Sequence, residues 1–188
     1  GSKFLYSGIG YGGSCFPKDV KALYKIGVEN NCNMSIIQAT EQANERQKTI
    51  LLDKPVPIFG DNLKDKTIAL WGLSFKPETD DMREAPSLYM LKKLSSFGCK
   101  IQVYDPIAME ETKRRLPNID ITYCNDIYSC VKEADALLLI TEWKEFRLPL
   151  WEKVRQEMKG NVVLDGRNIY DKEELKSLGF VYQGIGIK

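Results

Sequence analysis

The chain has 188 residues, 43% of them hydrophobic and 28% charged, and its 27 Lys and Arg almost balance its 26 Asp and Glu. This composition predicts a globular protein with a core of its own, and it gives no electrostatic reason to bind nucleic acid or an anionic membrane surface. Because no apolar run approaches the roughly 20 residues that a spanning helix needs, we expect a cytoplasmic protein that does not enter the membrane.

Two residue types limit the chemistry. The sequence holds no histidine, which excludes Ser-His and Cys-His nucleophiles and metals bound by His. Any reaction must therefore use Cys, Lys, Asp or Glu. The cysteines are scattered and form no CxxC pair, so we expect neither a disulfide framework nor a thiolate metal site. They are Cys15, Cys32, Cys99, Cys124 and Cys130.

The chain opens on Gly1-Ser2 rather than on Met, and a glycine-rich stretch follows almost at once. We therefore expect a fragment from which an upstream segment is missing. Apolar residues at helical spacing then predict an amphipathic helix over residues 17–29 and a longer one over residues 33–53, whose polar face includes Lys48. Two prolines end the second helix, and we place a domain boundary near residues 54–65.

Beyond this boundary, short β-rich apolar runs alternate with amphipathic segments. We expect strands over residues 67–73, 100–104, 120–124, 136–141, 162–165 and 180–183. We expect helices over residues 86–97, 108–115, 127–134, 148–158 and 172–178. This alternation predicts an α/β fold: a Rossmann-like, doubly wound, mainly parallel six-stranded sheet preceded by a helical segment.

Polar clusters follow three of the predicted strands, over residues 74–83, 141–144 and 165–168. The ligands of open parallel sheets bind beyond the carboxyl ends of the strands. We therefore expect these clusters to meet at one edge of the sheet and to form a binding site.

The segment from Gly8 to Asp19 runs four glycines into a cysteine that stands just before the first predicted helix. The helix N-terminus and Lys18 favour an anion, including the thiolate of Cys15, and the glycines let backbone N–H groups approach a bound anionic oxygen. Asp19 lies one helical turn after Cys15, where its carboxylate can activate a water. The segment predicts a nucleophilic thiol beside an anion site, and the alternative is a glycine turn that ends in a small structural thiol.

Three motifs, in order, resemble those of the nucleotide-sugar dehydrogenase family, and of its UDP-glucose-oxidising group in particular: GGSCFPKD at residues 12–19, FKPETDDMREAPS at residues 75–87 and DGRN at residues 165–168. The resemblance covers nearly the whole chain but only the second half of such an enzyme. It implies that residues 1–60 are the tail of the central helical dimerisation domain, with the catalytic Cys loop. Residues 61–188 would be the C-terminal UDP-sugar-binding domain.

The family's N-terminal NAD-binding domain has no counterpart in the sequence, because no GxGxxG follows a predicted strand. The resemblance therefore implies part of an NAD-dependent enzyme, and we expect the 188 residues alone to be inactive. The implied reaction is a four-electron oxidation of a sugar's primary alcohol to a carboxylate, through a thiohemiacetal and a thioester on a cysteine.

The resemblance also implies roles for single residues. Cys15 would be the catalytic thiol and Asp19 the acid that helps to activate water, while Lys18 and Arg83 match cofactor-binding positions. The implied partners are a UDP-sugar and a second copy of the chain, which would form a homodimer through the helix over residues 33–53. Substrate-binding positions are matched by Tyr6, Ser7, Gly8, Ile9, Gly10, Tyr11, Gly12, Phe75, Lys76 and Arg167.

Alternatives are open for each of these assignments. The substrate could be the GDP-mannose or UDP-N-acetylhexosamine of other family members, and a non-catalytic nucleotide-binding or dimerisation module could carry the same glycine loop. Lys76 and Arg167 could be ordinary solvated cations. Asp80 and Asp81 could suggest a magnesium site, but we favour a structural turn and expect no metal.

Overall fold

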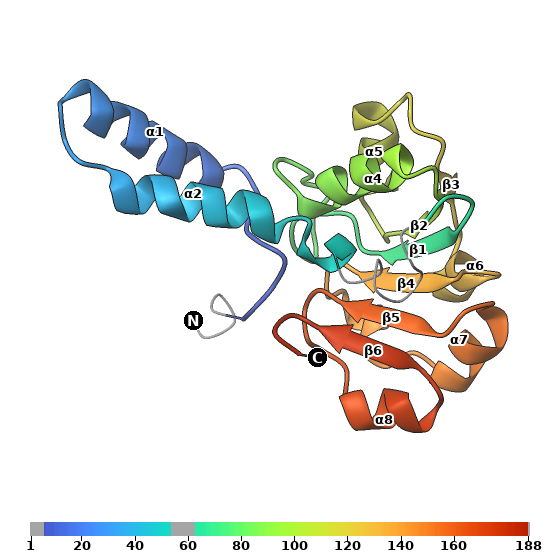
Figure 1. The fold of residues 1–188 in the computed structure, drawn as a ribbon. Coiled ribbons are helices and arrows are strands. Elements are labelled where there is room, and N and C mark those ends of the chain that lie inside the picture. Colours follow the sequence, from blue (N-terminus) through green and yellow to red (C-terminus); the bar gives the residue numbers. More distant parts are fainter. Residues whose placement is uncertain (1–5, 54–62, 188) are drawn as a thin grey trace.

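The structure is a computed structural model that describes residues 6–53 and 63–187. Within these residues, six strands form one sheet in the order β3-β2-β1-β4-β5-β6, and every neighbouring pair is parallel (Figure 1). The predicted α/β fold is therefore confirmed, and the sheet is parallel throughout. The strands are β1 Thr67–Trp71, β2 Lys100–Tyr104, β3 Thr122–Tyr123, β4 Ala136–Leu139, β5 Val162–Asp165 and β6 Val181–Gly184.

Helices cover both faces of the sheet. Side chains of α4 share a core cluster with Ile68 and Leu70 of β1, whereas α6, α7 and α8 pack on the opposite face against Ala69 and Trp71. Successive residues of β1 thus point into different layers, and both layers are buried, which explains the continuous apolar runs in the sequence. The helices of this part are α4 Pro86–Ser96, α5 Met109–Arg115, α6 Ile127–Val131, η3 Lys144–Phe146, α7 Trp151–Glu157 and α8 Lys172–Ser177.

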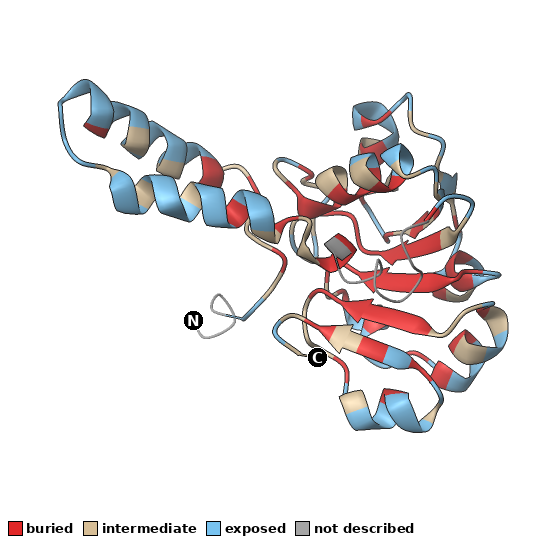
Figure 2. Ribbon diagram, viewed as in Figure 1, coloured by how far each residue is buried: buried red, intermediate tan, exposed pale blue. Residues whose placement is uncertain are grey.

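The N-terminal part is a helical hairpin that projects from the sheet (Figure 1). It consists of α1 Phe16–Glu29 and α2 Ser35–Gln47, and the short 3-10 helix η2 Ile50–Asp53 follows. Most of the hairpin is exposed, whereas the central strands β1, β4 and β5 are almost wholly buried (Figure 2). Its base is fixed to the sheet, because Ile9, Leu51 and Leu52 are at most 1% exposed and belong to the same core cluster as β1.

Some predicted boundaries are wrong. The helix expected over residues 33–53 ends at Gln47, because the chain turns there and carries Leu51 and Leu52 into the core of the sheet. The strand expected over residues 120–124 is the two-residue edge strand β3, and α7 begins at Trp151, after Pro149. The boundary proposed near residues 54–65 lies mostly outside the described residues. Within the described part of the chain, the helices are all too short or too polar to cross a membrane.

Candidate functional site

A cavity of about 820 Å³ lies between the hairpin and the carboxyl ends of the strands. Phe75 and Lys76 reach it from the loop after β1, Glu142 from the segment after β4 and Arg167 from the loop after β5. The structure thus brings together the three polar clusters expected at this edge of the sheet. The cavity is lined by Tyr6, Gly8, Gly10, Tyr11, Gly12, Phe16, Thr40, Ala43, Asn44, Gln47, Phe75, Lys76, Glu142 and Arg167.

Helix α2 holds the glycine-rich loop over residues 8–13 against the cavity. The Asn44 side chain accepts from Tyr11 N at 2.8 Å and donates to Tyr11 O at 3.2 Å, and Gln47 Nε2 donates to Gly8 O at 2.7 Å. The Tyr11 hydroxyl donates to Glu41 at 2.7 Å, and the pKa of Tyr11 is raised by burial and by this hydrogen bond. The bonds from Asn44 and Gln47 satisfy backbone groups of the loop that have no partner in a helix or strand.

Gly10 shows why a glycine is needed in this loop. Its φ is +91°, a conformation that residues with a side chain rarely adopt, and a Cβ would lie 2.7 Å from Asn44 Oδ1. A larger residue would therefore disturb both the turn and the Asn44 bonds.

Two cations line the cavity in different ways. Lys76 is exposed, and its ammonium lies 5.3 Å from the centre of the Phe75 ring. Arg167 is half-buried, and its guanidinium faces Glu142 with Nη2–Oε1 at 2.8 Å and Nε–Oε2 at 2.7 Å. Lys76 and Arg167 both line the cavity, and Arg167 already forms an ion pair with Glu142 from the segment after β4.

Two fully buried aspartates make this edge of the sheet rigid. Asp105, at the end of β2, accepts five hydrogen bonds: from Leu73 N, Ser74 N and Trp143 Nε1 on Oδ2, and from Ile107 N and Ala108 N on Oδ1. Asp165, the last residue of β5, accepts from the backbone N–H groups of Arg167, Ile169 and Tyr170 and from the Tyr182 hydroxyl. These bonds fix the loops that carry the cavity side chains.

The thiol lies at the start of the hairpin. Cys15 is exposed, immediately precedes α1, and follows Gly12 and precedes Phe16, which both line the cavity. Its carbonyl accepts from Asp19 N at 2.8 Å, which places Asp19 one turn later as expected. Lys18 and Asp19 are also exposed and form an ion pair at 3.4 Å.

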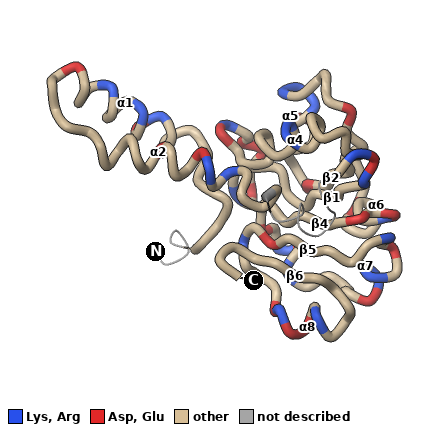
Figure 3. The backbone as a smooth tube through the Cα atoms, in the orientation of Figure 1, with Lys and Arg blue, Asp and Glu red and all other residues tan. Residues whose placement is uncertain are grey.

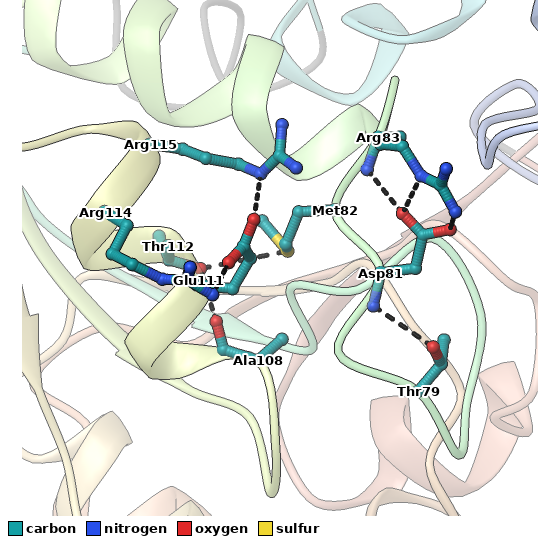
Figure 4. Close-up of polar contacts among 9 residues, drawn as sticks. All are labelled: Thr79, Asp81, Met82, Arg83, Ala108, Glu111, Thr112, Arg114 and Arg115. Carbon is teal, nitrogen blue, oxygen red and sulfur yellow. Dashed lines mark hydrogen bonds and ion pairs between the residues drawn. The ribbon is translucent and has the colours of Figure 1, made fainter.

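Arg83 lies on the loop between β1 and α4, and its carbonyl accepts from Gly13 N, two residues before Cys15, at 2.7 Å. Asp81 holds its guanidinium in a fork, with Nε–Oδ1 at 2.9 Å and Nη2–Oδ2 at 2.8 Å (Figure 4). The pKa of Asp81 is lowered chiefly by this hydrogen bonding, and that of Arg83 is raised by Asp81 and, to a smaller extent, by Cys15. Because Asp81 Oδ1 also accepts from Arg83 N, the acid has the place in a turn that we favoured.

The remaining predicted residues have other surroundings. Ile9 is 1% exposed and its side chain belongs to the core, so only its backbone can face a ligand. The Ser7 hydroxyl accepts from Asn168 Nδ2 at 3.3 Å. Glu142 belongs to the polar cluster over residues 141–144, whereas sequence reasoning missed several other lining residues, namely Phe16, Thr40, Ala43, Asn44 and Gln47.

The fold and the site define a Rossmann-type α/β domain with a cavity at its strand ends, and Cys15 lies at the start of the adjoining helical hairpin. The family model for the UDP-binding domain of the UDP-glucose/GDP-mannose dehydrogenase family matches residues 69–172, and the model for the central domain of that family matches residues 1–46. The chain belongs to the UDP-glucose/GDP-mannose dehydrogenase family.

Similar proteins agree with this assignment. A UDP-glucose 6-dehydrogenase of Pseudomonas aeruginosa is 44% identical over 99% of this chain and 42% of its own length, and one of Rhizobium meliloti is 39% identical over 99% and 42%. The structure of a UDP-glucose dehydrogenase from Pyrobaculum islandicum superposes with a TM-score of 0.83 at 29% identity, over 96% of this chain and 39% of that one. The chain therefore spans about two fifths of the relatives it matches.

Proposed function

We propose that the chain supplies the thiol and the UDP-sugar site of an NAD-dependent UDP-glucose 6-dehydrogenase, with residues 1–60 belonging to its central domain and residues 61–188 binding the nucleotide sugar. The cavity carries this proposal, since eight of the ten expected substrate residues line it and Cys15 stands beside it. Those eight are Tyr6, Gly8, Gly10, Tyr11, Gly12, Phe75, Lys76 and Arg167.

In the proposed reaction, Cys15 captures the sugar after its first oxidation. The Sγ thiolate would add to the aldehyde carbon and hold it as a thiohemiacetal, whose oxidation leaves a thioester. Water would then release the carboxylate and free the thiol, and Asp19 would accept a proton from that water. The cavity would orient the sugar nucleotide, with Lys76 beside its diphosphate and Arg167, fixed by Glu142, as a second donor.

The dinucleotide would supply the hydride acceptor for both oxidations. Lys18 and Arg83 suit this group because both cations are exposed and are held by Asp19 and Asp81. An exposed guanidinium fixed through two of its nitrogens can still donate from its remaining N–H groups to a phosphate or an amide.

A second copy of the chain is the proposed partner of the hairpin. Apolar side chains on α1 and α2 are exposed, and α1 carries its lysines between them (Figure 3). A hairpin of this kind gains stability when a partner covers its apolar residues. These residues are Phe16, Leu23, Ile26, Val28 and Ile36.

Calorimetric titration of the 188-residue chain tests the site. We expect heat of binding with UDP-glucose and a weaker response with GDP-mannose and UDP-N-acetylglucosamine, and no reduction of NAD when UDP-glucose and NAD are added together. The second expectation follows because near-attack positioning, worth about 7–11 kcal/mol, needs a domain that holds the dinucleotide. Absence of heat with every UDP-sugar would refute the proposed site, and tighter binding of GDP-mannose would move the assignment to that group.

A non-catalytic nucleotide-binding module is the second candidate. If the chain is such a module, the Cys15 thiol should be no more reactive than an ordinary exposed thiol. Cys32 is a matched control, because it is also exposed but lies beyond the C-terminus of α1. If the proposed enzyme is right, iodoacetamide modifies Cys15 faster than Cys32, whereas equal rates favour the module.

A further inference from the structure

Glu142 is the one carboxylate among the described residues that line the cavity. Its side chain is 16% exposed, and the proposed reaction gives it no role beyond fixing Arg167. Two further carboxylates at the strand ends, Asp105 and Asp165, are fully buried, and both oxygens of each accept hydrogen bonds from the protein. The described lining of the cavity therefore offers a ligand a single anionic acceptor.

Glu142 and Arg167 form a pair without net charge. Arg167 Nη2 donates to Oε1 at 2.8 Å, and Nε lies 2.7 Å from Oε2. Each carboxylate oxygen can accept a further hydrogen bond, and Nη1 of the guanidinium can still donate. Because the pair attracts a diphosphate through one partner and repels it through the other, it is a weak anion site. A hydroxyl group both donates and accepts, so it can bond to both partners.

The glycine-rich loop over residues 8–13 gives the cavity two distinct ends. A Cβ on Gly8 would overlap Arg167 Nη1, so the loop begins against the charged pair. A Cβ on Gly13 would lie 2.8 Å from Phe75 Cε2, so the loop finishes against the segment after β1. The first contact comes from the segment after β5, and β4 lies between β5 and β1 in the sheet. The two contacts therefore mark separate ends of the site.

The thiol adjoins the Phe75 end. Cys15 follows the glycine-rich loop by two residues, and Lys76 is the neighbour of Phe75 in the chain. In the proposed reaction, the sugar carbon that is oxidised lies at the Cys15 sulfur and the diphosphate lies beside Lys76. The diphosphate joins the sugar to the nucleoside, so the nucleoside extends toward the other end of the cavity. Glu142 and Arg167 lie at that end.

We propose that Glu142 is a specificity-determining residue, which accepts hydrogen bonds from the ribose hydroxyls of the nucleoside while Arg167 holds its carboxylate in place. This role rests on the proposed function, which sets the direction of the sugar nucleotide in the cavity. A nucleotide that lacks a ribose hydroxyl leaves the half-buried carboxylate without that donor, and its affinity falls accordingly.

Three nucleoside diphosphates, UDP, 2′-deoxy-UDP and 3′-deoxy-UDP, measure this selection by isothermal titration calorimetry of the 188-residue chain. We expect the parent chain to bind UDP about tenfold tighter than at least one deoxy compound, the scale of a hydrogen bond to a charged group. In Glu142→Ala this preference disappears, while the affinity for that deoxy compound does not fall, because a repelling charge has left the cavity. A fall for all three compounds would mark a structural effect and overturn the proposal, as would a parent chain without the preference or a preference that survives in Glu142→Ala.

Two variants control for charge and for the phosphate contact. Glu145→Gln removes an exposed carboxylate three residues away, outside the cavity lining, and leaves the preference unchanged. Lys76→Ala weakens the binding of UDP and of both deoxy compounds by the same factor. Glu142→Gln takes the place of Glu142→Ala if the latter does not fold. Its amide oxygen is a neutral acceptor, so the preference falls to about threefold, and an unchanged preference refutes the role of Glu142.

The comparison with UDP-glucose separates this role from the proposed function. Binding of UDP-glucose without a preference among the three diphosphates keeps the function and refutes the role of Glu142. No binding of UDP or UDP-glucose refutes both. If Glu142→Ala weakens UDP-glucose relative to UDP and leaves the ribose preference intact, Glu142 faces the hexose and the proposed direction of the nucleotide is wrong.

Discussion

Lys76 and Arg167 line the same cavity, but their surroundings differ. Lys76 is exposed beside an aromatic ring, whereas Arg167 is bound to Glu142 at two points. A diphosphate would gain more from the exposed ammonium, because the charge of Arg167 is already balanced. Lys76 is therefore the residue whose loss tests the phosphate subsite most directly.

We predict that Lys76→Ala weakens the binding of UDP-glucose by about 1.5–3 kcal/mol, the scale of a hydrogen bond to a charged group, or about ten- to hundredfold in the dissociation constant. Isothermal titration calorimetry on the 188-residue chain measures it. Lys144→Ala is the control, because its side chain is 92% exposed and pairs with Glu78, and neither residue lines the cavity. Unchanged affinity in Lys76→Ala would place the diphosphate elsewhere.

The depressed pKa of Glu84 predicts how stability depends on pH. The group titrates at about 2 in the folded chain against an ordinary value of 4.5, so its contribution is complete above about 4.5 and disappears as the pH falls toward 2. Urea unfolding of Glu84→Gln at a series of pH values should show a flatter dependence over this interval and a lower free energy of unfolding at pH 7. Glu29→Gln serves as the control, and an equally steep acid limb in Glu84→Gln would contradict the assignment.

At the scale of elements, Asp105 connects the segments that follow β1 and β4 to the start of α5. Its carboxylate binds the backbone after β1, the start of α5 and the Trp143 indole after β4. The segments after β1 and β4 carry Phe75, Lys76 and Glu142 of the cavity wall, so the acid stabilises the fold and the shape of the site together.

We predict that Asp105→Ala lowers the free energy of unfolding by about 3 kcal/mol or more, because five donors, most of them buried, lose a charged acceptor. Denaturant unfolding followed by circular dichroism measures this loss. Asp126→Ala is the matched control, since Asp126 only caps α6 at the surface and its loss should cost about 1 kcal/mol. A loss for Asp105→Ala no larger than that of the control would show that water replaces the carboxylate.

The elements were largely predictable, because apolar runs and helical spacing are local signals. The contacts that build the site were not. Helical spacing puts Lys48 on the polar face of the predicted helix. Only the turn after Gln47 shows that Lys48 is buried against Glu84. Asn44 gives no signal as a polar residue within a helix, and the Arg167–Glu142 pair joins residues 25 positions apart in the segments that follow two neighbouring strands.

At the scale of the whole molecule, the hairpin determines the predicted assembly. We expect the 188-residue chain to form a dimer, and Ile36→Glu to shift it toward monomer, because Ile36 is 80% exposed on α2 and a carboxylate there would be buried without a partner. Sedimentation equilibrium measures the change. Leu148→Glu is the control, at a residue 92% exposed on the sheet domain. A monomeric parent chain, or equal dissociation in both variants, would exclude the hairpin as the interface.

The contact between Ser7 and Asn168 joins residues 161 positions apart, and Ile9 packs near Gly166 in the same core. Contacts of such high sequence separation form late, because the whole intervening chain must first be ordered or looped out. During synthesis, the loop before Cys15 can reach its final place only after β5 has left the ribosome. The loop before Cys15 therefore lacks its contacts with the sheet while most of residues 1–188 are being synthesised.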